Sequence, residues 1–380
     1  MLPLDGVLVV GLEVAVSAPH CTRQLADLGA RVIKIESGGG DFARWYDDAV
    51  GEVSAHFAWA NRGKESAVLD LKAEADRAVV ERMLARADVL VQNLAPGSAE
   101  RLGLDARSAV DRHPRLVAVD ISGYGHGGPR ATSRAYDLLV QAESGSCAVT
   151  GEPGHPAKPG IPLADIGTGM VAANAVLAAL LARGRTGAGA AISVAMFDVV
   201  TDWMSWALHQ ARSSGTDPLP RGMSSPMVSP YGAFETADGQ TLVVGTTNDG
   251  EWQRLATDVL GRPDLADDPR YAGNADRVRR RAEIDAVIAE WAAGQTFAVA
   301  SAAAERAGIG WARYNTPTEV LAHPQLSERD RWVTTAAPGG EFSSLRPAAD
   351  CPSWAWEPQD VPGLGVETEA VRREFRAGPG

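Results

Sequence analysis

The chain has 380 residues, 45% of them hydrophobic, a composition that excludes an intrinsically disordered protein. Its formal net charge of −12 argues against a partner such as nucleic acid or an anionic membrane, so an anionic ligand would need a local basic pocket. Three widely spaced cysteines, Cys21, Cys147 and Cys351, provide neither a disulfide framework nor a zinc cluster, and no metal site is predicted.

The N-terminal sequence MLPLDGVLVVGLEV has no basic leader and no small-residue cleavage site. No apolar run reaches the roughly 20 residues that a membrane span needs. The sequence therefore predicts a cytoplasmic protein.

Short β-branched runs alternate with helix-like stretches along the first half of the chain. Strands are expected at 7–14, 32–36, 67–71, 89–92 and 116–121, and helices at 22–28 and 73–86. This alternation predicts a doubly wound, Rossmann-like α/β domain over residues 1–212, with ligands bound beyond the carboxyl ends of its strands.

A change in composition marks a second domain. Residues 213–230 predict a linker, and 231–325 a small α+β domain with a hairpin across Asp238-Gly239 and helices at 251–260, 275–293 and 297–307. Residues 326–380 predict a return segment without a fold of its own that packs on the large domain.

The segment PGIPLADIGTG, residues 159–169, places Asp165 in a Gly-rich turn before an apolar helix predicted at 170–182. The helix is expected to end at RGRTG, since glycine is a common C-terminal signal. An aspartate at a helix entrance is commonly an N-cap, so the residues by themselves leave both a capping and a catalytic interpretation open.

Other motifs point to no cofactor. Residues 123–128 (GYGHGG) fit G-x-G-x-x-G, but Pro129-Arg130 follows instead of a helix, which argues against nicotinamide or flavin binding. The stretch 37–41 (SGGGD) lacks the Lys-Ser/Thr of a phosphate-binding P-loop. The seven histidines have no metal-ligand spacing, and no G-x-S-x-G elbow occurs.

Many separated segments nevertheless resemble the class III (CaiB/BaiF-type) CoA-transferases in order and spacing. They are APHCTRQLADLGARVIKIE, GGGDFAR, NRGKESAVLDLK, ADVLVQNLAPGSAERLGL, ISGYGHGGP, YDLLVQAESG, TGEPG, ADIGTG and GRTGAGAAISVAMFD. The resemblance covers essentially the whole chain. It implies a Rossmann-like large domain, a small α+β domain, and a homodimer in which two chains interlock as linked rings.

The resemblance also implies that Asp165 is the catalytic carboxylate. Its attack on an acyl-CoA thioester would give a mixed anhydride, and the released thiolate would convert this to an aspartyl-CoA thioester. Since one thioester is exchanged for another, neither ATP nor a metal is needed, and CoA thioesters are substrates rather than bound cofactors. We expect Gly167 and Gly169 to allow close approach and to offer N–H groups to an oxyanion.

An α-methylacyl-CoA racemase of the same superfamily is the alternative activity. Such racemases carry a His base at the position of Tyr136, and tyrosine, with an ordinary pKa near 10, is a poor base at neutral pH. This favours the transferase. Tyr136 is then expected to pack against the pantetheine arm, and Asp137 to orient the site.

Matching family segments supply candidates for binding CoA. Lys72, Arg101 and Arg134 would concentrate positive charge around the phosphates. Ser37 stands where formyl-CoA transferases have a phosphate-binding Arg, so we expect Arg44 to take that role. The full set is Val16, Ser17, Arg44, Leu69, Lys72, Asn93, Leu94, Arg101 and Arg134.

The second half of the chain resembles the subgroup that acts on mesaconate, itaconate and citramalate, with succinyl-CoA as a common donor. It lacks the glycine-only loop that closes over oxalate in formyl-CoA transferases. Arg221, Ser224 and Ser225 are candidates, by position only, for holding a second carboxylate. Long-chain, bile-acid and carnitine-type acids stay open as alternatives.

Overall fold

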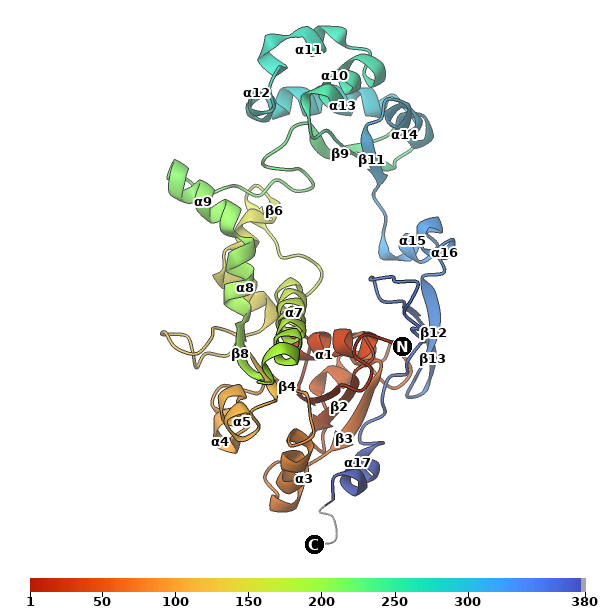
Figure 1. The fold of residues 1–380 in the computed structure, drawn as a ribbon. Coiled ribbons are helices and arrows are strands. Elements are labelled where there is room, and N and C mark those ends of the chain that lie inside the picture. The colour runs from red at the N-terminus through yellow and green to blue at the C-terminus, as the bar shows by residue number, and fades with distance from the viewer. Residues whose placement is uncertain (377–380) are drawn as a thin grey trace. The chain divides into compact units, whose positions relative to one another are not determined.

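The computed structural model describes residues 1–376 and divides the chain into two compact units. Unit 1 contains residues 1–146, residues 159–206 and the segment from Ser327 onward (Figure 1). Unit 2 contains Cys147–Lys158 and Ala207–Leu326.

A six-stranded parallel sheet with the order β3-β2-β1-β4-β5-β8 forms the centre of unit 1. All neighbouring pairs in it run parallel. The order reverses between β1 and β4, and a doubly wound sheet binds its ligands at such a switch point. The strands are β1 (Leu8–Leu12), β2 (Arg31–Glu36), β3 (Lys64–Val68), β4 (Val89–Gln92), β5 (Val117–Ser122) and β8 (Ala190–Ala195).

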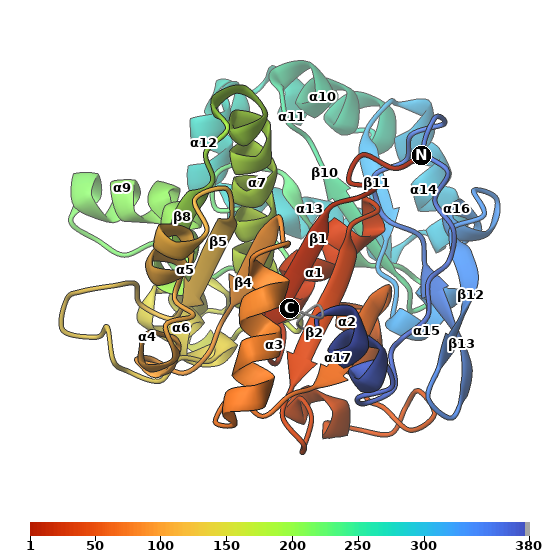
Figure 2. The same cartoon turned by 60° about the horizontal axis from the view of Figure 1, so that its bottom comes forward.

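Two hydrophobic cores cover the two faces of the sheet, because successive strand side chains point to opposite sides. Val9 belongs to a core with α1 (Ser17–Asp27) and α7 (Leu163–Thr186). Val10 belongs to the opposite core, with α3 (Glu74–Leu84), α5 (Ala106–Arg112) and α17 (Thr368–Glu374). Figure 2 shows α3 and α17 together in front of the sheet.

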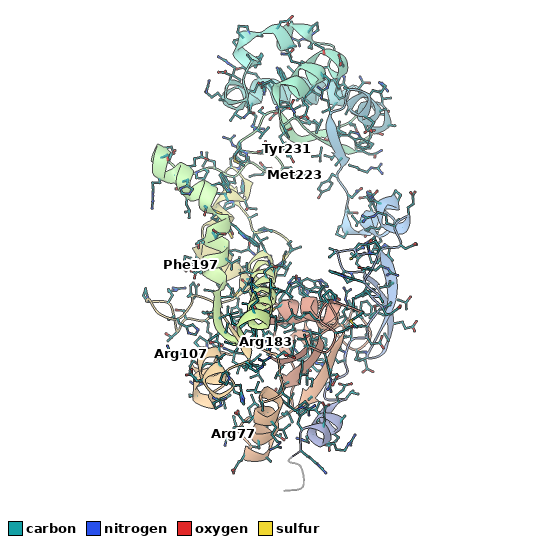
Figure 3. The ribbon with its side chains drawn as sticks, viewed as in Figure 1. Arg77, Arg107, Arg183, Phe197, Met223 and Tyr231 are labelled. Carbon is teal, nitrogen blue, oxygen red and sulfur yellow. The ribbon has the colours of Figure 1, made fainter. Side chains whose placement is uncertain are left out.

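Helix α7 begins seven residues before the predicted helix, so it includes Asp165, and it ends at Gly187 with φ of 76°. The helix has 24 residues, and an 18-residue window of it has a mean hydropathy of 1.6. By length and composition it could therefore cross a membrane, contrary to the expectation that no apolar run is long enough. In unit 1 its buried side chains pack on the sheet and on α1 instead. Arg183, labelled in Figure 3, ties its last turn to Asp88 at 2.8 Å.

The remaining elements of unit 1 surround this centre, and the return segment has structure that the sequence did not predict. It forms a hairpin, β12 (Trp332–Ala337) with β13 (Gly340–Leu345), and the helix α17, and it belongs to unit 1. The others are η1 (Phe42–Trp45), α2 (Ala55–Asn61), α4 (Ser98–Leu102), α6 (Asp137–Glu143) and α8 (Met196–Trp203); η2 (Ser146–Val149) begins at the last residue of the first segment of unit 1 and continues into unit 2.

Unit 2 is an α+β unit with an antiparallel sheet of order β11-β10-β9. The predicted hairpin is present as β9 (Tyr231–Glu235) and β10 (Thr241–Gly245), and β11 (Gly310–Arg313) completes the sheet. Its helical elements are α10 (Asp249–Arg254), η3 (Leu255–Val259), α11 (Pro263–Asp267), η4 (Pro269–Tyr271), α12 (Asn274–Arg279), α13 (Arg281–Ala293), α14 (Phe297–Arg306), α15 (Pro317–Leu321) and α16 (Pro324–Ser327).

The boundaries of unit 2 differ from the predicted ones. The short hairpin β6 (Gly151–Glu152) and β7 (His155–Pro156) was assigned to the large domain by sequence, yet it groups with unit 2. The Gly222 N–H donates to the Gly151 carbonyl at 2.6 Å, which joins this hairpin to the expected linker. Most of α9 (Ser205–Ser214) also lies in unit 2, so the predicted boundary at 212 is late.

Candidate active site

The turn between β1 and α1 has an unusual backbone. Ala15 adopts φ of 62°, a conformation that costs a non-glycine residue about 1–2 kcal/mol. Its N–H donates to the Asp41 carboxylate at 3.1 Å, and the Val14 N–H and carbonyl both bond the Asn93 side chain at 2.9 Å. Asn93, a predicted CoA ligand, therefore holds the turn in place.

A buried ion cluster lies beneath this turn. Lys34 Nζ donates to Asp41 at 2.8 Å and to the Glu13 carbonyl at 3.0 Å, while Lys64 Nζ lies 2.7 Å from the Glu13 carboxylate. Burial would raise the pKa of Glu13, but Lys64 and Lys34 bring it below its ordinary value. Removing one partner of such a cluster leaves an uncompensated buried charge, which typically costs about 3–5 kcal/mol.

Arg44 belongs to the wall of this cluster and does not take the role predicted for it. Its guanidinium makes two bonds to the Glu36 carboxylate, at 2.9 and 2.6 Å, and a third to the Pro362 carbonyl at 3.0 Å. Only 1% of the residue is exposed. Because the Arg44 guanidinium already bonds Glu36 and a backbone carbonyl, it is not available to a CoA phosphate in this structure. This corrects the prediction.

Asp165 occupies the first turn of α7, and Pro162 is the N-cap residue. The simple N-cap interpretation is therefore wrong. The hydroxyl and the N–H of Ser17, the first residue of α1, act as hydrogen-bond donors to the Asp165 carboxylate. Burial raises the pKa of Asp165 to about 7 and the nearby Asp137 carboxylate adds to the rise, while the two Ser17 donors oppose it.

Asp137 connects α6 to the start of α7. One of its oxygens accepts from the Ala164 N–H at 2.9 Å, and the other accepts from Gln141 Nε2 at 2.7 Å. It therefore satisfies one of the unpaired N–H groups of the α7 N-terminus. The side chain that raises the pKa of Asp165 is also one that fixes the helix carrying it.

The two glycines of the motif are packing positions. A Cβ on Gly167 would lie 2.0 Å from the Trp203 ring, and a Cβ on Gly169 would lie 2.6 Å from the Ser17 carbonyl oxygen. Both residues are buried inside α7, where N–H groups bond within the helix. We therefore correct the expectation that they admit substrate and supply oxyanion donors: they let Trp203 and α1 approach helix α7, which carries Asp165.

Aromatic residues around Asp165 were missed by sequence reasoning. His20 contacts Gly169, and burial lowers the pKa of His20 to about 4, with Arg23 and Lys64 lowering it further. Its ring lies 5.2 Å from that of Trp59. Burial raises the pKa of Tyr46, and the nearby charges of Asp165 and Tyr136 contribute to this rise. These rings follow no fixed spacing in the sequence, so only the fold brings them together.

A cavity of about 780 Å³ opens at the carboxyl ends of the central strands. Leu12–Val14 lie along it where β1 ends, and the loop Ser37–Asp41 follows β2. Its other lining residues include the predicted ligands Leu69, Lys72, Leu94 and Arg101, and also Asp70, Asp76, Ser98 and Arg372. Its place at the strand ends is the one expected for a doubly wound sheet.

The predicted CoA ligands thus fall into separate groups. Val16 and Ser17 form the turn at the start of α1, between the end of β1 and Asp165. Arg134 is exposed and does not line the cavity, and Tyr136 is 56% exposed at the N-cap of α6.

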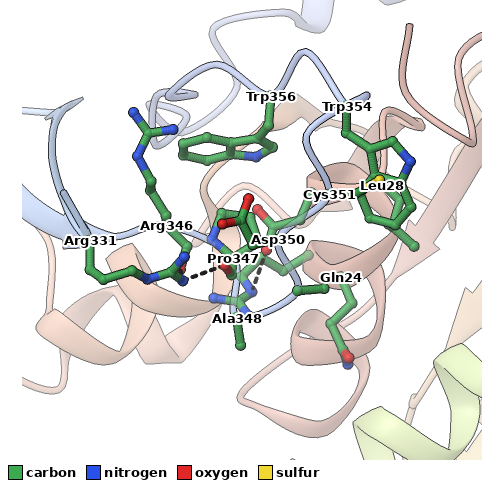
Figure 4. Close-up of a pocket in the computed structure, with 13 residues that line it drawn as sticks. Gln24, Leu28, Arg331, Arg346, Pro347, Ala348, Asp350, Cys351, Trp354 and Trp356 are labelled. Atoms are coloured by element: carbon green, nitrogen blue, oxygen red, sulfur yellow. Dashed lines mark hydrogen bonds and ion pairs between the residues drawn. The ribbon is translucent and has the colours of Figure 1, made fainter. Parts of the chain in front are cut away.

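A second cavity of about 340 Å³ lies elsewhere in unit 1, against the end of α1 (Figure 4). Arg331, Arg346, Trp354 and Trp356 line it, together with Cys351, whose pKa is lowered by its bond to the Ser353 hydroxyl. Neither Asp165 nor any predicted CoA ligand lines this cavity.

The candidates for a second substrate carboxylate lie in unit 2. Arg281 Nη1 donates to the Ser224 hydroxyl at 2.6 Å, and Arg281 Nη2 donates to the Ser225 carbonyl at 2.5 Å. Burial lowers the pKa of Arg281, and the charge of the exposed Arg221 contributes to the lowering. Ser224 thus supports the segment before β9.

Within residues 1–376, no group of three or more His, Cys, Asp or Glu side chains could hold a metal ion.

A doubly wound sheet, a cavity at its switch point with Lys72 and Arg101 on its wall, and a partly desolvated carboxylate at a helix start are the features of an α/β protein with a candidate active site. The family model described as CoA-transferase family III matches residues 4–368.

Similar proteins agree with this class. The chain is 36% identical to the acetyl-CoA:oxalate CoA-transferase of Acetobacter aceti, over 99% of this chain and 96% of that protein. It is 34% identical to the succinyl-CoA:mesaconate CoA-transferase of Haloarcula hispanica, over 76% of this chain and 75% of that protein. A CAIB/BAIF family protein from Brucella suis has a solved structure with TM-score 0.84 and 33% identity, covering 99% of this chain and 100% of that one.

The chain therefore belongs to CoA-transferase family III. This confirms the family predicted from the sequence, and with it an enzyme whose substrates are CoA thioesters.

The raised pKa of Asp165 predicts a stability effect with a definite sign. Because the pKa is raised from its ordinary 3.8 to about 7, the folded protein holds this proton more tightly than the unfolded chain does. The free energy of unfolding therefore loses this contribution as the pH rises between these two values. Asp165→Asn removes the charge and should be more stable than wild type at pH 8, by about 4 kcal/mol.

Urea denaturation at pH 4 and pH 8 measures this difference, which should nearly vanish at the lower pH. The exposed Asp111 on α5 provides the control, Asp111→Asn, for which we expect no such gain. A wild type that is as stable as Asp165→Asn at pH 8 would contradict the analysis.

Proposed function

We propose that this enzyme moves CoA from an acyl-CoA donor, such as succinyl-CoA, to a carboxylic acid through an aspartyl-CoA thioester on Asp165. The observation that carries the proposal is the carboxylate itself: it lies in the first turn of α7, largely removed from water and bonded by Ser17. A carboxylate with a pKa of about 7 is a stronger nucleophile than an ordinary one and is still substantially ionised at neutral pH.

The chemistry balances without water, ATP or a metal. An Asp165 oxygen attacks the thioester carbonyl, the C–S bond breaks, and CoA thiolate leaves behind a mixed anhydride. The thiolate then attacks the aspartyl carbonyl and releases the donor acid. The acceptor carboxylate attacks the resulting aspartyl thioester, and the thiolate finally attacks the acceptor's acyl carbon, which restores the Asp165 carboxylate.

Asp137, Ser17 and the turn at Ala15 position this carboxylate. Asp137 holds the α7 terminus, and Ser17 fixes one face of the Asp165 side chain. Preorganised contacts of this kind lower the cost of reaching the attacking geometry. Asp165 loses activity when it is protonated, so the rate of the first half-reaction should fall as the pH drops below about 7.

For the acceptor we propose a short dicarboxylate, branched as in mesaconate, itaconate or citramalate. The similarity to the oxalate and mesaconate enzymes supports a dicarboxylate, and the sequence of the second half favours the branched acids.

We also propose a cytoplasmic homodimer. Apolar side chains exposed on unit 1 support a partner surface, since a water-exposed apolar group of this kind commonly marks an interface; they are Leu138, Leu139, Met170, Val171, Leu181 and Trp203.

Trapping the covalent intermediate tests the role of Asp165. After incubation with succinyl-CoA, intact-mass spectrometry should detect an enzyme-CoA adduct that hydroxylamine or borohydride converts to a stable product mapped to Asp165. Asp165→Ala should lose the adduct and slow CoA transfer at least about a thousandfold, because it removes the nucleophile. Asp111→Asn should keep both. CoA transfer by Asp165→Ala at the wild-type rate would rule the mechanism out.

An acceptor panel tests the reaction and the acid class. The enzyme is incubated with succinyl-CoA and itaconate, mesaconate, citramalate, oxalate or carnitine, and acyl-CoA masses are followed. We expect a new dicarboxylyl-CoA together with an equal amount of succinate. If no acid gives a product while solvent deuterium enters the α-carbon of a 2-methylacyl-CoA, the racemase alternative replaces the transferase.

Light scattering at micromolar concentration tests the homodimer. The expected mass is twice the 39.9 kDa of the chain, because the exposed apolar side chains of unit 1 would be covered by a second copy. A mass of one chain would contradict the dimer while leaving the chemistry of Asp165 untouched.

A further inference from the structure

Arg372 is a cation of the switch-point cavity that sequence reasoning did not find. The cavity is lined by three cationic side chains, Lys72, Arg101 and Arg372. The first two come from the central part of unit 1. Arg372 comes from α17, about 270 residues further along the chain than Arg101.

Helix α17 is firmly attached beside β3, so Arg372 has a fixed place at the cavity. The Glu367 carboxylate accepts from the Ser66 N–H at 2.7 Å, and the Thr368 hydroxyl accepts from the Val68 N–H at 2.9 Å. Val371 is completely buried in the core that also contains α3. The C-terminal helix therefore forms part of the cavity wall.

The Arg372 side chain is oriented and still has donor capacity. It bonds both oxygens of Asp76 at 3.1 Å, and Nη1 bonds Glu369 at 2.9 Å. These contacts, with a longer one from Nε to Asp76, make four bonds, whereas a guanidinium has five N–H groups. At least one N–H on Nη1 is left for another acceptor, and the side chain is 36% exposed.

The acidic residues that line the cavity differ in their pairing. Glu13, Glu36 and Asp41 are buried, and each bonds a lysine or arginine of its own. Asp76 pairs with Arg372, and Asp70 also lines the cavity. The loop Ser37–Gly40 contains no cation. The groups on this wall that can donate to a ligand phosphate are therefore Lys72, Arg101 and the remaining N–H of Arg372.

We propose that Arg372 binds the 3′-phosphate at the nucleotide end of CoA, with Lys72 and Arg101 completing the phosphate site. The inference rests on the proposed function, because it places the CoA thioester at Asp165. Val14 lines the β1 end of the cavity, three residues before Ser17, which bonds Asp165. The thioester arm occupies that side, and the nucleotide end lies at the three cations.

Binding of CoA and of 3′-dephospho-CoA, measured by isothermal titration calorimetry, separates the 3′-phosphate from the rest of the ligand. Wild type should bind CoA more tightly than dephospho-CoA. Arg372→Gln should weaken CoA about tenfold and change dephospho-CoA less than about twofold, since one charge-assisted contact is lost.

Two variants on the same helix serve as controls. Arg373→Gln removes an equal charge from the next residue, which is exposed and does not line the cavity. Glu369→Gln removes an ion-pair partner of Arg372 but keeps the cation. Both should retain the preference for CoA.

Equal weakening of CoA and dephospho-CoA by Arg372→Gln would overturn the assignment, as would an unchanged preference. So would loss of the preference in Glu369→Gln, because the effect would then come from the ion pairs of α17. A wild type that binds neither ligand would instead refute the proposed function, and the two failures are therefore distinguishable.

Discussion

The buried ion cluster beneath the β1–α1 turn is the constraint on which the rest of the site depends. Lys34 and Lys64 neutralise Glu13 and Asp41 in a place that water does not reach. Through Asp41 the cluster bonds the N–H of Ala15, which holds a left-handed conformation. That turn leads directly into Ser17, and Ser17 bonds Asp165. The buried charges thus support the segment that contacts the candidate catalytic carboxylate.

The groups around Asp165 shift its pKa in opposite directions. Burial and Asp137 raise its pKa and make the ionised carboxylate more basic, whereas the Ser17 donors retain part of the ionised form at neutral pH. The same Asp137 closes the α7 terminus through Ala164. An ionised Asp165 beside the Asp137 carboxylate destabilises the folded protein. The packed core of α1, α7 and the sheet offsets this cost.

The protein is acidic overall, whereas CoA is a polyanion, so the distribution of charges around the cavity matters. The acids near the inner end of the cavity are paired with buried cations, while Lys72 and Arg101 are exposed at the outer end. A net charge of −12 is therefore compatible with a basic patch on one wall. The C-terminal helix contributes to the same wall, so the end of the chain and its first strands line one cavity.

Local patterns in the sequence determined the parallel strands and the hairpin across Asp238-Gly239, and they identified Asp165 as a candidate, because strand runs, turn residues and family motifs are short-range signals. Tertiary structure decided what those patterns leave open. Arg44 and Asn93 could have faced a ligand, but Glu36 and Val14 bind them, and Gly167 and Gly169 make room for Trp203 and α1 instead of substrate. Arg372 joins the cavity only because α17 packs beside β3, a contact between residues about 300 positions apart, to which no local pattern points. The sequence specifies the type of each side chain. Which group that side chain bonds depends on how segments far apart in the sequence pack together.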